Sequence, residues 1–178
     1  ANDPALFVDA GLNPDTFRLE IDKKTTLAGL YIEPAADSLK TDTPVIPKGT
    51  VILLNDERLD RNSMIPLAKS FSDSGFAVVV YDQRACGLSS GKYHGEGFYE
   101  ANDLEEIIPY LELRQRIYQP VSVVGFSLGA DAALLAANDE ERIEKVVAVN
   151  PYLTTIRYQN MLKAEHGTTT RFHADIDI

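Results

Sequence analysis

The stretch Gly125-Phe126-Ser127-Leu128-Gly129 decides the fold of this chain. It follows a short apolar run at residues 121–124 and opens an alanine-rich segment at residues 128–137. The apolar run predicts a buried strand, and the alanine-rich segment predicts a helix. The quoted stretch is therefore expected to form a sharp turn that joins a strand to a helix.

Each residue of this turn has its own physical reason. Ser127 must occupy a strained turn if its hydroxyl is to stand above the sheet, where it can attack a substrate. Side chains at positions 125 and 129 would collide with the neighbouring strand and helix, so glycine is needed at both. The Leu128 backbone N–H, in the first helical turn, then points to where an oxyanion would develop. The structural alternative is that Ser127 only caps the helix.

Apolar runs and helical patterns alternate along the rest of the chain. Residues 50–54 and 76–81 are continuous apolar runs, which are typical of strands buried on both faces of a parallel sheet. Pro109 predicts a kink or a late start in one of the helices. The other expected elements are strands at residues 121–124 and 145–149 and helices at residues 63–74, 102–118 and 128–137. This alternation predicts an α/β fold with a doubly wound, mostly parallel sheet and helices on both faces.

The N-terminal part departs from that alternation. Residues 17–22 and 27–32 alternate apolar and polar side chains, which predicts an antiparallel hairpin at one edge of the sheet. Residues 33–49 contain three prolines and a glycine and are expected to form a loop. We therefore expect residues 1–178 to form a single α/β domain with an N-terminal antiparallel hairpin.

Composition excludes several classes of function. The net charge of −10 argues against nucleic acid and anionic membrane surfaces as partners, because both would repel the chain. No apolar run approaches the roughly 18 residues that a membrane span requires. The three histidines lack the spacing of metal ligands, and no glycine-rich nucleotide-binding motif occurs, so we expect neither a metal nor a cofactor.

Two features of the sequence bear on the cellular compartment of the protein: the single cysteine and the identity of the first residue. Cys86 has no second cysteine to pair with, and we expect it to be an inert thiol. The sequence begins at Ala1 without a methionine, which leaves both the cytoplasm and export after removal of an upstream signal open.

A second segment resembles a known family. Residues 81–91, Tyr-Asp-Gln-Arg-Ala-Cys-Gly-Leu-Ser-Ser-Gly, look like the D-x-R-x-x-G-x-S-x-G loop of bacterial α/β-hydrolases. Residues 97–104 fit the G-x-x-E-x-x-D-L stretch that follows this loop in the family. The G-x-S-x-G turn is the nucleophile elbow of the same superfamily, and the resemblance covers about residues 17–155. It implies that Asp82 and Arg84 have mainly structural roles.

The resemblance implies a serine hydrolase acting on an ester, thioester or amide acyl group of a small molecule. Ser127 would be the nucleophile, and the backbone N–H groups of Leu128 and Glu57 would hold the oxyanion. In the family an acid and then a histidine follow the serine. His173 is our candidate base and His166 the alternative, whereas no natural acid is evident. His94 precedes the serine and is expected to be solvated.

Two departures from the family pattern bear on activity. Where the family has His-Gly, this chain has Asn55-Asp56-Glu57-Arg58, and two carboxylates beside an oxyanion are unfavourable. Their cost is small if they point outward or pair with Arg58 or Arg61. In addition, the chain ends before the family's last strands, so we expect the domain to be incomplete at its C-terminal end, with residues 152–178 as the start of a lid or an irregular tail.

Three hypotheses follow from these features. The chain is the N-terminal and central part of a serine hydrolase, or it is a compact hydrolase that uses His173 as its base. The third hypothesis is a non-catalytic, hydrolase-like module for binding or assembly, in which an exposed sheet edge is covered by a second copy in a homo-oligomer.

Overall fold

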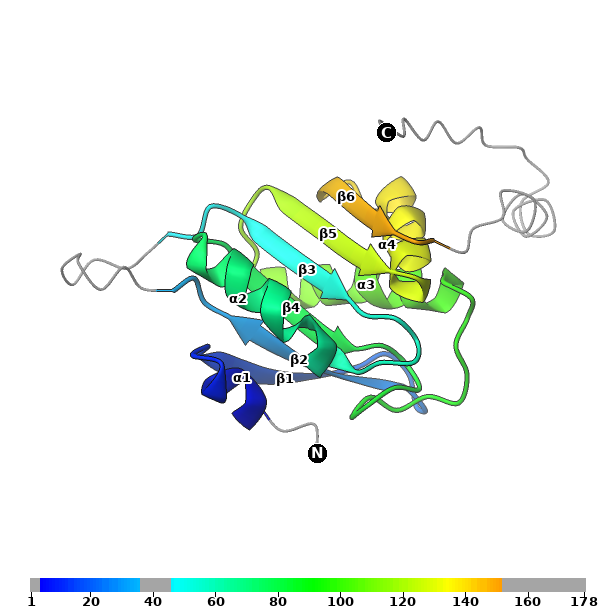
Figure 1. Ribbon diagram of the computed structural model, residues 1–178. Helices are drawn as coiled ribbons and strands as arrows, with labels where there is room; N and C mark the ends of the chain where they lie inside the picture. The colour runs from blue at the N-terminus through cyan, green and yellow to red at the C-terminus, as the bar shows by residue number, and fades with distance from the viewer. Residues whose placement is uncertain (1–3, 36–45, 152–178) are drawn as a thin grey trace.

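The six strands of the described residues, 4–35 and 46–151, form one mixed sheet in the computed structural model (Figure 1). Their order across the sheet is β1-β2-β4-β3-β5-β6. The strands are β1 (Pro14–Glu20), β2 (Thr26–Ile32), β3 (Thr50–Leu54), β4 (Ala77–Asp82), β5 (Val121–Phe126) and β6 (Ile143–Val149). β1 and β2 pair antiparallel, as do β2 and β4, and the remaining pairs are parallel. The predicted mostly parallel sheet with an N-terminal hairpin is confirmed.

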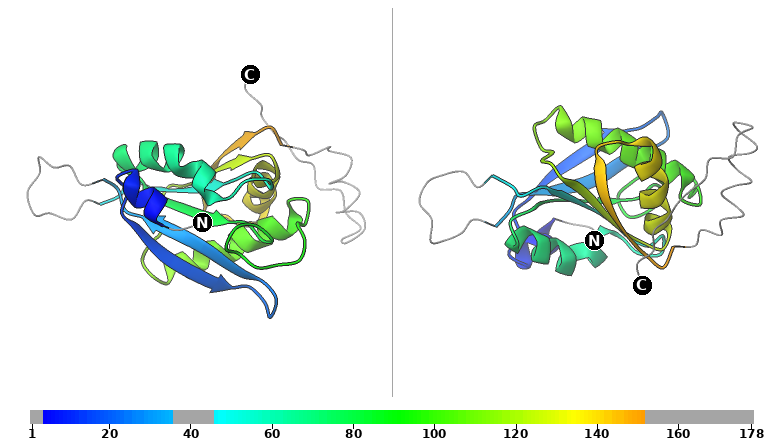
Figure 2. Two further views of the ribbon diagram at one scale, coloured as in Figure 1. Left: turned by 60° about the horizontal axis from the view of Figure 1, so that its bottom comes forward. Right: turned by 90° about the horizontal axis from the view of Figure 1, so that it is seen from above.

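Helices cover both faces of this sheet, as predicted (Figure 2). The 3-10 helix η1 (Arg61–Met64), α2 (Ile65–Asp73) and the short α1 (Ala5–Asp9) lie on one face. The other face carries α3 (Phe98–Glu112) and α4 (Leu128–Asp139). Within the part of the chain that the structure describes, no helix has the length and apolar character needed to cross a membrane.

Alternate residues of the central strands feed two separate cores. On β3, the side chains of Ile52 and Leu54 pack with α3 and α4, whereas Val51 and Leu53 pack with α2 and with Phe7 of α1. All residues of β3 and β4 are buried. The continuous apolar runs of these strands therefore reflect burial on both faces, as the sequence indicated.

Helix α3 differs from its prediction at both ends. We expected it at residues 102–118 with a kink or a late start at Pro109, but it spans Phe98–Glu112 and contains the proline. It starts early because Gly97, at φ 92°, begins the helix while the Glu100 carboxylate accepts the Gly95 and Gly97 N–H groups at 2.8 and 3.0 Å. It ends early because Gln115 takes the left-handed conformation at φ 56°.

Candidate active site

Ser127 lies on a strained turn between β5 and α4. Its backbone angles are φ 55° and ψ −117°, a combination that side chains rarely tolerate and that the surrounding structure must enforce. A Cβ at Gly125 would lie 2.1 Å from the carbonyl oxygen of Gly129, and a Cβ at Gly129 would lie 2.7 Å from that of Leu54. The expected strand-turn-helix and the steric need for both glycines are confirmed.

The Ser127 backbone is held from both sides, which leaves its hydroxyl available. The Ser127 N–H donates to the carbonyl of Val149 on β6 at 2.9 Å, and its own carbonyl accepts from Ala130 N–H at the same distance. The hydroxyl makes no capping hydrogen bond to α4, so the alternative that Ser127 is only a helix cap is wrong. Instead the hydroxyl donates to Glu57 Oε2 at 3.2 Å.

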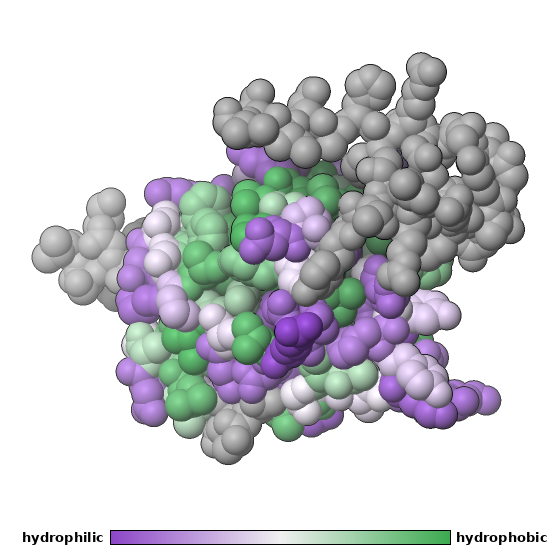
Figure 3. Space-filling view, turned by 45° about the vertical axis from the view of Figure 1, so that its right-hand side comes forward, coloured by the Kyte–Doolittle hydropathy of each residue, from purple (hydrophilic) through white to green (hydrophobic). Residues whose placement is uncertain are grey.

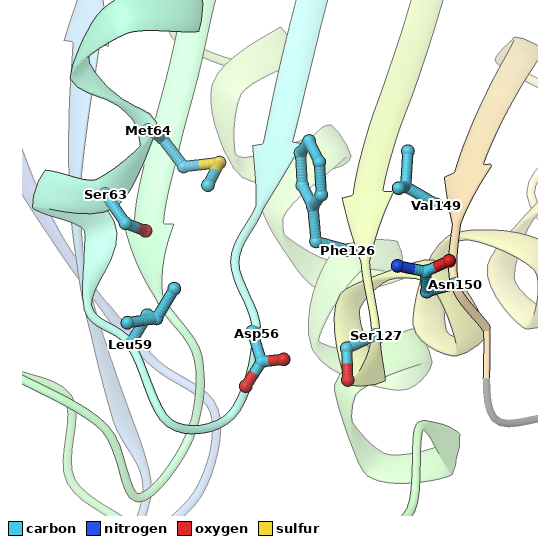
Figure 4. Close-up of a pocket in the computed structure, with 8 residues that line it drawn as sticks. All are labelled: Asp56, Leu59, Ser63, Met64, Phe126, Ser127, Val149 and Asn150. Carbon is cyan, nitrogen blue, oxygen red and sulfur yellow. The ribbon is translucent and has the colours of Figure 1, made fainter.

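A cavity of about 320 Å³ opens beside Ser127 (Figure 4). Its polar lining residues are Asp56, Ser63, Ser127 and Asn150, and its apolar ones are Leu59, Met64, Phe126 and Val149. This volume lies at the small end of the range typical of ligand sites. The sequence reasoning missed Asn150, although its position directly after a parallel strand is a usual place for site residues.

Two carboxylates lie next to the Ser127 hydroxyl. Asp56 lines the cavity close to Ser127, and Glu57 contacts the hydroxyl itself. Burial alone would raise the pKa of Asp56, but hydrogen bonds to its carboxylate, chiefly from the Arg58 N–H at 2.8 Å, outweigh burial and hold this pKa below its usual value. Asp56 therefore adds negative charge at the site.

The expected neutralisation of these carboxylates is only partly realised. Arg58 Nε lies 3.7 Å from Glu57 Oε1, but the Arg58 side chain is 82% exposed and the pair is weak. Arg61 is buried and pairs with Asp82 instead. Of the two arrangements that would limit the cost, outward orientation is not found for Glu57, because its side chain turns toward Ser127.

The two predicted oxyanion donors lie on neighbouring segments. Leu128 is the first residue of α4, so no carbonyl within the helix can accept from its N–H. Glu57 belongs to the loop after β3, and its contact with the Ser127 hydroxyl brings that loop to the elbow. The structure thus brings Ser127, Leu128 and Glu57 together, as the sequence predicted, while their chemical roles stay predictions.

The histidines are not part of this constellation in the described residues. His94 lies with its Nε2 3.8 Å from Cys86 Sγ and its Nδ1 3.7 Å from a Glu100 carboxylate oxygen. It is therefore partly buried rather than simply solvated, because the loop before α3 folds it against these two side chains. His173 and His166 lie outside the described residues.

Cys86 and the loop around it are structural. Burial is the main cause that raises the pKa of the Cys86 thiol to about 11, and the expected inert thiol stays a prediction that this pKa supports. Asp82 is buried and accepts the N–H groups of Arg61 and Leu88 at 2.9 and 3.0 Å. Arg84 pairs with the buried Asp103 on α3. No group of three or more histidine, cysteine and acidic residues within the described ranges could hold a metal ion.

Comparison with known proteins assigns this fold and elbow to a family. Residues 56–174 match the alpha/beta hydrolase fold family. Because the match covers more than half of the chain, the protein belongs to the alpha/beta hydrolase fold family. The matched range contains the elbow and the 81–91 loop.

Individual relatives resemble parts of the chain. YqkD of Bacillus subtilis (strain 168) is 32% identical over 96 residues, which are 54% of this chain and 30% of YqkD. The thiohydrolase apmlB of Arthrinium phaeospermum is 33% identical over 89 residues, 48% of this chain and 29% of that protein. The solved structure of the Pyrococcus furiosus esterase Pf2001 is similar with a TM-score of 0.71 at 24% identity, covering 90% of this chain and 60% of the esterase. The chain thus spans less than a third of the two curated relatives.

Proposed function

We propose that this chain carries the nucleophile of a hydrolase that cleaves an ester, thioester or amide acyl group of a small molecule. The observation that carries the proposal is the backbone of Ser127, at φ 55° and ψ −117°, beside a cavity at the carboxyl ends of the strands. Backbone strain at a serine that does not cap its helix indicates that its hydroxyl has a functional role rather than a role in stabilising the fold. The alpha/beta hydrolase family membership and the thiohydrolase among the relatives support the reaction class.

The chemistry follows from the positions of the groups. Ser127 Oγ adds to the acyl carbon while a base takes the hydroxyl proton, and the N–H groups of Leu128 and Glu57 hold the oxyanion. Collapse of the tetrahedral intermediate releases the alcohol, thiol or amine with that proton. Water then hydrolyses the acyl-enzyme. In the starting structure the hydroxyl donates to Glu57, so this contact must break as the proton moves to the base.

Turnover of the natural full-length protein tests the nucleophile and the base separately. We expect hydrolysis of p-nitrophenyl butyrate or of an acyl thioester, and a loss of at least about 10³-fold in kcat with Ser127→Ala. His173→Ala should abolish turnover if His173 is the base, whereas His166→Ala should abolish it if the alternative base, His166, is used. Unchanged turnover in His173→Ala would remove this histidine from the mechanism but leave Ser127 in it.

Two observations favour the second candidate, a non-catalytic module for binding or assembly. The Glu57 carboxylate accepts a hydrogen bond from the hydroxyl of the proposed nucleophile, and a carboxylate is unfavourable where an oxyanion would form. Among the described strands β6 lies at one edge of the sheet, and the side chain of its Val147 is 54% exposed. Exposed apolar side chains on an edge strand are expected where a second chain binds. This candidate predicts no turnover by the natural protein together with a dimer or larger assembly in light scattering.

A further inference from the structure

The loop after β3 places negative charge at the point where a substrate must approach Ser127. The Glu57 carboxylate lies 3.2 Å from Ser127 Oγ, and Asp56 lines the adjoining cavity. The Glu57 side chain is 24% exposed, so much of its surface is shielded from water. A charge that is partly shielded from solvent acts on a neighbouring ligand more strongly than a charge that is fully exposed to solvent.

The surroundings supply little positive charge in return. The described residues that line the cavity include no lysine, arginine or histidine. Arg58 reaches Glu57 only at 3.7 Å from an exposed position, and Arg61 is engaged with Asp82 in the interior. On the face toward which the strands' carboxyl ends point, hydrophilic side chains lie beside hydrophobic ones (Figure 3). The negative charge beside Ser127 is therefore only partly offset, by the exposed Arg58.

The rest of the cavity is apolar. Leu59, Met64, Phe126 and Val149 form its walls, and they suit the hydrocarbon part of an acyl group. Figure 4 shows Asp56 and Ser127 side by side at one end of this group of side chains. An acyl chain that enters the cavity thus passes the carboxylates next to its reactive carbon.

We propose that Asp56 and Glu57 make this site selective for acyl substrates that carry a positive charge near the scissile bond. A cationic group would supply the remaining counter-charge, whereas an anionic group would meet two carboxylates and be repelled. The proposal rests on Ser127 hydrolysing acyl substrates, as proposed above. It adds the charge of the substrate, which neither the family membership nor the elbow specifies.

Three butyrate esters of one shape test this selectivity with the natural full-length protein. Their alcohol part is 2-(trimethylammonio)ethanol, 3,3-dimethylbutanol or 2-hydroxyethanesulfonate, so that the group that differs lies close to the scissile bond. We expect kcat/KM to fall in that order, with the cationic ester preferred over the anionic one by about tenfold or more at low salt. Both Glu57→Gln and Asp56→Asn should reduce this ratio, and added salt should reduce it in the wild type.

Asp73→Asn is the matched control, because it removes one negative charge from an exposed pair with Lys69 on α2. It should leave the cationic-to-anionic ratio unchanged. Equal kcat/KM for the three esters, or a ratio that Asp73→Asn lowers as much as Glu57→Gln does, would overturn the proposal. Absence of hydrolysis for all three esters is a different outcome, since it would remove the hydrolase function itself and the selectivity with it.

Discussion

At the scale of single residues, the elbow depends on two glycines that serve a steric purpose. A Cβ at Gly125 would lie 2.1 Å from a backbone oxygen, a contact that no side-chain movement can relieve. We expect Gly125→Ala to lower the free energy of unfolding by about 3 kcal/mol or more. Urea denaturation at neutral pH measures this change.

Gly11→Ala provides the comparison for that substitution. Gly11 has a positive φ of 79°, but the nearest atom to its added Cβ is the end of the flexible Lys69 side chain at 3.7 Å. The expected loss is about 1 kcal/mol, from backbone strain alone. Equal losses for both variants would show that the elbow is looser than these distances imply.

The Cys86 thiol offers a second prediction at this scale. With a pKa raised to about 11, little thiolate is present at pH 8. Iodoacetamide should therefore modify Cys86 in the folded protein about a hundredfold more slowly than in the urea-unfolded chain. Mass spectrometry of the Cys86 peptide follows the reaction. Equal rates in the two states would mean that the thiol is exposed in the folded protein and has an ordinary pKa.

At the scale of elements, Arg142 joins three of them. It lies between α4 and β6, donates to Glu140 at the end of α4, and reaches Glu112 at the end of α3. Hydrogen bonds from Arg142 are the main cause that lowers the pKa of Glu140 from its usual 4.5. A carboxyl whose folded pKa is depressed stabilises the fold above its unfolded pKa and loses that contribution as the pH falls through the folded value.

Arg142→Ala should consequently cost stability in a pH-dependent way. We expect a loss of about 1–2 kcal/mol at pH 7 that shrinks below pH 4.5 as Glu140 becomes protonated. Urea unfolding at pH 7, 5 and 3.5 measures it. Lys69→Ala, which breaks the exposed i,i+4 pair with Asp73 on α2, should cost about 0.5 kcal/mol or less. A loss for Arg142→Ala that stays constant with pH would contradict this linkage.

The elements themselves could be predicted from the sequence where burial dictates the pattern. Strands β3, β4 and β5 lie within two residues of their predicted bounds, because a strand buried on both faces must be apolar throughout. The ends of α3 could not be predicted in this way. Its start depends on the Glu100 side chain, which accepts hydrogen bonds from the N–H groups of the preceding loop, and its end depends on Gln115, a non-glycine residue in the left-handed conformation. The five residues of α1 are too few for a periodicity to appear.

At the scale of the whole molecule, the sheet brings together residues that are far apart in the chain. Glu57 and Ser127 are 70 positions apart, and they meet because β3 and β5 are parallel neighbours whose carboxyl ends lie at one edge. The sequence predicted that Glu57 would lie near Ser127. It could not predict that the carboxylate, rather than only the backbone, would face the hydroxyl, because that depends on side-chain packing around the loop.

The natural full-length protein treated with a fluorophosphonate tests the central claim most directly, because this reagent forms a covalent adduct only with an activated serine. We predict an adduct on the peptide that contains Ser127, located by mass spectrometry, and none in Ser127→Ala. Gly11→Ala, which lies away from the elbow, should be labelled like the wild type. An unlabelled Ser127 in the folded natural protein, or labelling that persists in Ser127→Ala, would contradict the claim that Ser127 is the nucleophile.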